Sequence, residues 1–247
     1  MRMTRFGFAR VFLLALAAAA PGFPAEPFAD GTFALVDLTL IDGTGSAPVP
    51  RAVVLVKNGS VEDAGSEDDV PVPRGYARVS LHGSYLMPGF INAHVHGAYN
   101  EARLRAWLAA GVTSVRDLGP QSSFDFIEER DRLNRADGNA RIIAATTLIT
   151  WPGGYGSAYV DSPAAARKAV QDFVRRGADV VKIAIGDDLA HMVVEPLTDA
   201  EAENTRVFFR AGGKIPDFLV VAGNPVEDIR FLEKPVLVFK SGRPVLR

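Results

Sequence analysis

Two histidines spaced two residues apart offer the clearest chemistry in the sequence. His94 and His96 lie at the end of the strongly apolar run of residues 86–95, which predicts a buried strand. Side chains at positions i and i+2 of a strand project from the same face, so both imidazoles can reach one ion. Imidazole binds zinc, iron, nickel or copper, and α/β folds bind ligands at the carboxyl ends of their strands. The bare spacing also fits an ordinary turn, but its place before a capped helix favours a metal site.

A lysine lies within a second apolar run. Lys182 is part of residues 180–185, which are rich in β-branched side chains. Burying its ammonium group would be costly. Two interpretations therefore stay open: the side chain extends outward from the end of a strand, or it lies at the mouth of the same sheet and serves the metal site.

These side chains require a scaffold in which strands and helices alternate. The expected buried strands cover residues 86–95, with a break at Pro88-Gly89, and residues 112–115, 141–149 and 180–185. Asn100 is expected to cap a helix that stops at Gly111, and Ser122 or Ser123 opens a helix that runs to Leu133. This alternation predicts a parallel sheet covered by helices, of the doubly wound or barrel type.

The helix before the fourth strand has the clearest signals. Ser162 is an N-cap followed by proline at the first helical position, and Gly177 is the stop. Its expected buried face consists of Ala166, Val170, Phe173 and Val174.

Both ends of the chain predict short antiparallel strands. Residues 35–41 and 52–56 come first, and Asn58-Gly59 supplies the positive φ values of a two-residue hairpin turn. Residues 218–222 and 236–240 are expected strands near the other end, with a turn at Ser241-Gly242. The β character is therefore split around the alternating middle.

Several ordered motifs along the chain carry a family resemblance. They cover residues 86–97, 111–119 and 177–182 in the middle, and residues 41–45, 213–221 and 223–225 at the ends. Together they resemble the amidohydrolase superfamily, in particular its imidazolonepropionase-like and prolidase-like dipeptidase branch. The resemblance implies an α/β fold: a (β/α)8 TIM-type barrel with a small β-sandwich formed by both chain ends.

On this resemblance the chain divides into three parts. Residues 1–25 are a signal peptide, residues 26–86 with 213–247 form the composite β-sandwich, and residues 87–212 form the barrel region. A complete barrel takes about 250 residues, so we expect a partial barrel of about four of the eight strands. An internal deletion near residues 203–212 would account for the missing half. Exposed sheet edges would then favour a homo-oligomer.

The resemblance also implies a reaction. One or two divalent metal ions, usually zinc, lie at the barrel mouth; His94 and His96 bind the more buried ion, and carboxylated Lys182 bridges two ions. A metal-bound hydroxide then attacks the carbonyl of an amide, peptide or cyclic amide. The implied substrate is a small amide or dipeptide, and the enzyme is a metal-dependent hydrolase of C–N bonds.

The family pattern is incomplete in this chain. The resemblance requires two further histidines, on the fifth and sixth strands, and an aspartate after the eighth strand, and none has a counterpart here. His82 precedes the barrel in an expected loop, while His191, Asp187 and Asp188 follow the fourth strand and could approach the site. The alternative to an active hydrolase is therefore a catalytically incomplete half-barrel. The catalytic proton-transfer residue is unassigned.

Composition excludes several other classes. The 247 residues contain no cysteine, so disulfides and thiolate metal ligands are excluded, and a net charge of −2 without a basic block argues against nucleic-acid binding. Arg2, Arg5 and Arg10 precede a short apolar run at residues 11–20, which predicts a secretory signal peptide cleaved after Ala25 or Ala20. Ten apolar residues are too few for a membrane span. We therefore expect a secreted or periplasmic protein.

Overall fold

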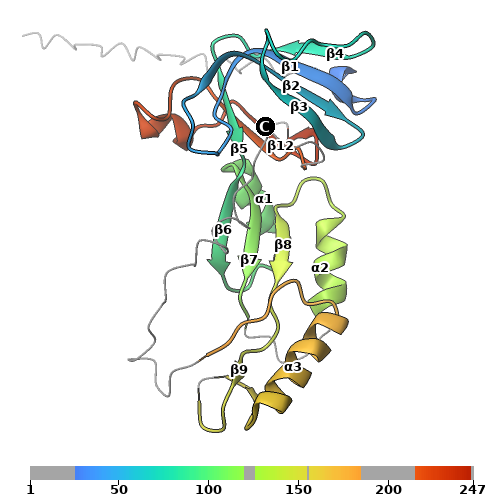
Figure 1. Cartoon of the computed structure of the whole chain (residues 1–247), viewed down its shortest axis with the longest axis vertical. Coiled ribbons are helices and arrows are strands. Elements are labelled where there is room, and N and C mark those ends of the chain that lie inside the picture. The colour runs from blue at the N-terminus through green and yellow to red at the C-terminus, as the bar shows by residue number, and fades with distance from the viewer. Residues whose placement is uncertain (1–25, 120–125, 155, 185–214, 246–247) are drawn as a thin grey trace, which may run out of the picture.

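The computed structural model describes residues 26–119, 126–154, 156–184 and 215–245 as a mixed α/β fold (Figure 1). Several predictions fall outside these ranges: the signal peptide of residues 1–25, the start of the second helix at Ser122 or Ser123, and the loop side chains Asp187, Asp188 and His191. Within the described part of the chain, no helix is both long and apolar enough to cross a membrane.

The largest sheet has eight strands and takes them from both ends of the chain. They are β1 Thr32–Leu40, β2 Val49–Lys57, β3 Ser60–Ser66, β4 Ala77–Ser80, β5 Tyr85–Pro88, β11 Phe218–Val221, β12 Leu237–Lys240 and β13 Arg243–Val245. The order is β13-β12-β11-β5-β1-β2-β3, and β4 pairs with β1. The antiparallel pair β5 and β11 joins the two ends, with Pro88 opposite Phe218. Short 3-10 helices, Glu26–Phe28 and Ile229–Glu233, flank these strands.

Turn residues set the hairpins of this sheet as the sequence predicts. Asn58 and Gly59 have φ values of 52° and 71° between β2 and β3. Ser241 and Gly242 have φ values of 51° and 76° between β12 and β13. Positive φ at both central residues gives a turn whose twist matches the twist of the flanking strands.

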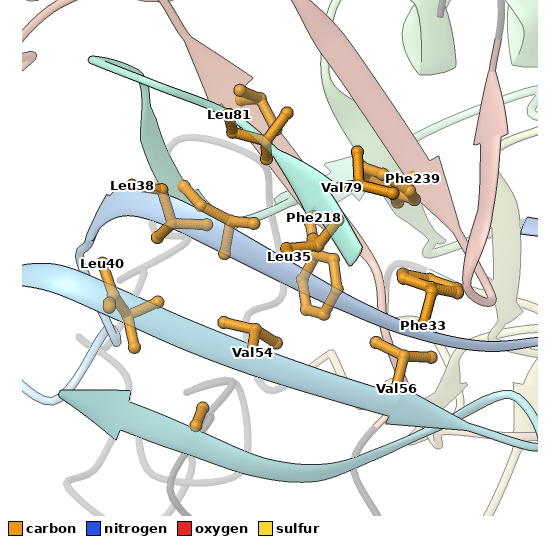
Figure 2. Close-up of a cluster of buried hydrophobic side chains, with 14 of the residues drawn as sticks. Phe33, Leu35, Leu38, Leu40, Val54, Val56, Val79, Leu81, Phe218 and Phe239 are labelled. Carbon is orange, nitrogen blue, oxygen red and sulfur yellow. The ribbon is translucent and has the colours of Figure 1, made fainter. Parts of the chain in front are cut away.

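The eight-stranded sheet curls around a core of its own (Figure 2). Phe33 of β1 and Phe239 of β12 are fully buried, and their ring centroids are 6.0 Å apart. In the sheet order, β1 and β12 are three strands apart, which is about 14 Å in a flat sheet. The sheet therefore bends until distant strands face each other. Its division into the two layers of a sandwich stays a prediction.

A second, parallel sheet lies beyond the first (Figure 1). It contains β6 Phe90–Val95, β7 Val112–Asp117 and β8 Arg141–Ala144 in that order. Helices α1 Glu101–Ala109 and α2 Phe126–Asn134 cover one face of it and share its apolar core. The Asn100 side chain accepts from the Arg103 backbone N–H at 3.0 Å, which confirms the predicted N-cap.

The chain passes from one sheet to the other at Pro88-Gly89. The N–H of Gly89 donates to the carbonyl of Asp217 at 2.9 Å, beside the eight-stranded sheet. The next N–H, that of Phe90, donates to the carbonyl of Gly111 at 2.9 Å, beside the parallel sheet. The predicted break in the apolar run is therefore the junction between the two sheets.

The predicted fourth strand is only partly formed. Two isolated parallel bridges, Ala145 with Val180 and Ile149 with Ile183, attach residues 180–184 beyond β8. The predicted third strand is also shorter than expected, because β8 ends at Ala144 and Ile149–Thr150 forms β9, which pairs with β10 Ala158–Tyr159. The expectation of four continuous barrel strands therefore needs correction.

The helix that precedes this segment begins as predicted but buries a narrower face. Helix α3 spans Pro163–Arg175, and the Ser162 hydroxyl accepts from the Ala165 backbone N–H at 3.2 Å. Phe173 is buried, but Val174 is 58% exposed, contrary to the predicted apolar face.

Candidate metal centre

The two predicted histidines meet at the carboxyl end of β6. Their Nε2 atoms are 3.2 Å apart. Two nitrogens bound to one tetrahedral zinc ion at about 2.0–2.1 Å lie roughly 3.3 Å apart. The spacing is therefore close to that of two ligands of one ion. Both side chains are exposed on the face of the parallel sheet that α1 and α2 do not cover.

The other ring nitrogen of His96 has a fixed neighbour. Its Nδ1 atom contacts the carbonyl oxygen of Gly119, just after β7. A carbonyl can only accept, so a hydrogen bond at this contact places the proton on Nδ1 and leaves the lone pair on Nε2. Histidine ligands in metalloproteins are commonly oriented by such a hydrogen bond.

The surroundings of His94 favour its neutral form. Its pKa is lowered from the ordinary value by desolvation first, and then by the positive charge of Lys182, by His96 and by Arg116. Only a neutral imidazole can bind a metal ion. The local electrostatics therefore hold His94 in the state that a metal site requires.

Lys182 lies near enough to His94 for its charge to act on that ring. It belongs to the bridged segment of residues 180–184 and is half-buried. Burial lowers the pKa of Lys182, while the charge of Asp117 opposes this shift. The structure thus brings all three predicted site residues to one end of the parallel sheet and favours the mouth interpretation of Lys182 over the outward one. Its carboxylation stays a prediction.

One residue of this region was not singled out from the sequence. Asp117, the last residue of β7, is fully buried. Its Oδ2 accepts from the Ala98 N–H at 2.7 Å, and its Oδ1 accepts from the Gly119 N–H at 2.9 Å. The available signal was an acid at a strand end two residues before a glycine.

Comparisons with known proteins found partial matches in sequence. No family model matches the chain. It is 36% identical over 82 residues to a 5-methylthioadenosine/S-adenosylhomocysteine deaminase of Symbiobacterium thermophilum. The aligned residues cover 30% of this chain and 19% of that protein. It is 35% identical over 68 residues to an imidazolonepropionase of Legionella pneumophila. These aligned residues cover 26% of this chain and 17% of that protein. The chain thus matches less than a fifth of the length of either curated relative.

Solved structures show the same fold. A Xaa-Pro dipeptidase with bound methionine superposes with a TM-score of 0.61 at 15% identity, covering 87% of this chain and 100% of that one. An amidohydrolase gives a TM-score of 0.63 at 15% identity, covering 87% and 99%. The chain is a relative of the amidohydrolase superfamily.

Two other titratable residues, His82 and Asp217, lie away from this site. His82 is exposed in a turn, as predicted. Asp217 is buried against the eight-stranded sheet, where it pairs with Arg141 at 2.7 Å. Across residues 26–119, 126–154, 156–184 and 215–245, no three His, Asp or Glu side chains gather in a way that could hold a metal ion. The described donors are therefore two histidines and a neighbouring lysine.

Proposed function

We propose that this chain is a metal-dependent hydrolase of C–N bonds in a small amide, peptide or cyclic amide. The observation that carries this proposal is the His94–His96 pair, with Nε2 atoms 3.2 Å apart at the carboxyl end of a parallel strand. The names of the relatives support the bond type, since they include a deaminase, an imidazolonepropionase and a Xaa-Pro dipeptidase.

Each site residue has a defined part in this proposal. His94 and His96 would hold a divalent ion, zinc on the basis of their nitrogen donors. When bound, such an ion supplies Lewis acidity to the carbonyl of the scissile bond. Lys182 has a pKa lowered by burial, which favours the neutral amine that reacts with carbon dioxide. The resulting carbamate would add oxygen donors to a site that otherwise has few.

Metal content tests the proposal directly. The purified chain is expected to retain zinc, and the double variant His94→Ala/His96→Ala is expected to lose it. His82→Ala is the matched control, because His82 is exposed in a turn and has no part in the site. Wild-type chain with no metal above background would overturn the proposal. Hydrolysis of a dipeptide and cyclic-amide panel then identifies the substrate class.

Carboxylation of Lys182 has its own test. Growth or incubation with 13C-labelled carbon dioxide should give a carbamate resonance in the wild-type chain. The variant Lys182→Ala should lack this resonance, whereas Lys168→Ala, which removes an amine from α3, should keep it. A resonance that survives Lys182→Ala would contradict the assignment.

A catalytically incomplete half-barrel is the second candidate function. It is favoured by the short donor set of the described residues and by the uncovered face of β6–β8. Unpaired strand edges would then favour association of two copies. Stoichiometric zinc with no hydrolysis of any panel substrate, together with a dimer in sedimentation, would favour this candidate. Turnover that disappears in His94→Ala/His96→Ala would exclude it.

A further inference from the structure

The histidine pair lies where the backbone ladder between β6 and β7 is irregular. Asn92 pairs with Val115 and Val95 pairs with Asp117, and the register shifts between these two points. The backbone N–H of His94 contacts the Asn92 Oδ1 atom at 3.4 Å, within its own strand. The ladder alone therefore does not fix the backbone that presents His94.

Two consecutive side chains of β7 hydrogen-bond to the backbone on either side of the histidine pair and hold it in place. Arg116 Nε donates to the carbonyl of Ala93 at 2.6 Å, one residue before His94. Asp117 Oδ2 accepts from the N–H of Ala98 at 2.7 Å, two residues after His96. Neighbouring side chains of a strand point to opposite faces. Arg116 and Asp117 therefore hold residues 93–98 by hydrogen bonds from opposite faces of the sheet.

Asp117 also reaches the ring of His96 through the backbone. Its Oδ1 accepts from the Gly119 N–H at 2.9 Å, and the carbonyl of Gly119 contacts His96 Nδ1. The carboxylate is fully buried, and a buried carboxylate is tolerated only when it is hydrogen-bonded. Its two bonds therefore fix both the Ala98 and Gly119 sides of the histidine pair.

We propose that Arg116 and Asp117 are positioning residues that hold residues 93–98 in place, and that Asp117, acting through Gly119, sets the His96 tautomer with its proton on Nδ1. This tautomer leaves Nε2 as the metal-binding atom. Neither residue touches the ion in this proposal. Only the effect on metal affinity rests on the proposed function; the tautomer is a property of the metal-free chain.

The variant Asp117→Asn tests the proposal with little change in shape. Ala98 and Gly119 donate to different oxygens of the carboxylate, and in asparagine one of these positions becomes an NH2 group, which donates and cannot accept. Asp217→Asn is the control: Asp217 is also buried and accepts from a backbone N–H, that of Ser241 at 2.7 Å, but its ion pair is with Arg141 at the start of β8, at the opposite end of the parallel sheet from the histidine pair. Loss of general stability should affect both variants.

The first readout is the histidine ring 15N spectrum of the metal-free chain. Wild type and Asp217→Asn should show His96 with its proton on Nδ1, and Asp117→Asn should shift to a mixture of tautomers. The second readout is zinc affinity by chelator competition. Asp117→Asn should weaken it by about 10- to 100-fold, the range for residues that orient metal ligands, and Asp217→Asn should not.

Each outcome decides the matter. An unchanged His96 tautomer in Asp117→Asn, or an equal change in both variants, would overturn the proposal. A tautomer change without zinc binding by wild type would support the positioning role and overturn the metal function. Should Asp117→Asn fail to fold, amide hydrogen exchange of wild type replaces it. Slow exchange at Ala98 and Gly119 is expected, and rapid exchange at both amides would refute the role of Asp117.

Discussion

The eight-stranded sheet and the parallel sheet of β6, β7 and β8 bury their apolar side chains in different ways. The first sheet curls on itself, so that Phe33, Phe218 and Phe239 form a core to which, of the described helices, only the short 3-10 helix Glu26–Phe28 adds a side chain, Phe28. The second depends on α1 and α2 for one face and leaves His94 and Phe90 accessible on the other. We therefore expect most of the stability to come from the first sheet, whereas the candidate metal ligands lie on the second.

The largest effect is expected in the core of the eight-stranded sheet. Phe33 is fully buried, whereas Phe90 on the open face of β6 is 36% exposed. Phe33→Ala should lower the free energy of unfolding by about 3–5 kcal/mol because it leaves a cavity. Phe90→Ala should lower it by less than about 1 kcal/mol. Chemical denaturation measures both, and equal losses would contradict the comparison.

The junction between the two sheets is expected to be sensitive to a single added methyl group. A Cβ atom at Gly89 would lie 2.3 Å from Thr113 Cγ2. Gly89→Ala should therefore destabilise the chain by roughly 1–3 kcal/mol through overpacking. Thr113→Ala removes the two closest atoms, Cγ2 and Oγ1, and keeps only Cβ at 2.9 Å, so the double variant should recover part of the loss. Strictly additive losses in this double-mutant cycle would show that the close approach is not the cause.

A smaller effect is expected at the start of α1, in the parallel region. Asn100→Ala removes the side-chain acceptor for the Arg103 N–H and should cost about 1 kcal/mol. Asn100→Asp keeps that acceptor and should be close to wild type. Hydrogen exchange should show the change in α1 before it shows any change in the eight-stranded sheet. Uniform loss of protection in both regions would mean that they unfold as one unit.

The smallest expected effect is a pH dependence of the free energy of unfolding, which arises at Tyr76 beside the eight-stranded sheet. Burial and a hydrogen bond to Glu62 raise the pKa of Tyr76 from 10.0 to about 12. Because the folded state holds this proton more tightly, the contribution is complete below pH 10 and is lost as the pH rises to about 12. Solvent screening limits it to ~0.5 kcal/mol. Denaturation of wild type and Tyr76→Phe across this range checks it; parallel curves would contradict the assignment.

Local signals in the sequence predicted the fold well where a few residues decide the conformation. The Asn58-Gly59 turn, the Asn100 cap and the break at Pro88-Gly89 all appear as expected. The strand over residues 180–185 was predicted from composition, but a strand also needs hydrogen-bonding neighbours. With β8 ending at Ala144, only isolated bridges hold that segment.

In the candidate site, too, the sequence predicts what neighbouring residues decide and misses what depends on the pairing of strands. Spacing alone placed His94 and His96 on one face, because the two-residue period of a strand is a local property. The cost of burying an ammonium group within an apolar run indicates Lys182 as a candidate for the site. The sequence does not reveal the role of Asp117, because an acid at the end of a strand can either face solvent or accept from two backbone N–H groups. Only the pairing of β6 with β7 reveals the difference.

The pairing of β5 with β11 has an evolutionary consequence. The chain leaves the eight-stranded sheet at Pro88 and returns at Phe218, and these two residues lie opposite each other. Residues 89–217 are thus an insert whose two ends are neighbours. Loop-closure entropy depends only weakly on the length between such ends. Insertions and deletions between residues 89 and 217 are therefore expected to reshape the region of the candidate metal site at little cost to the pairing of β5 with β11.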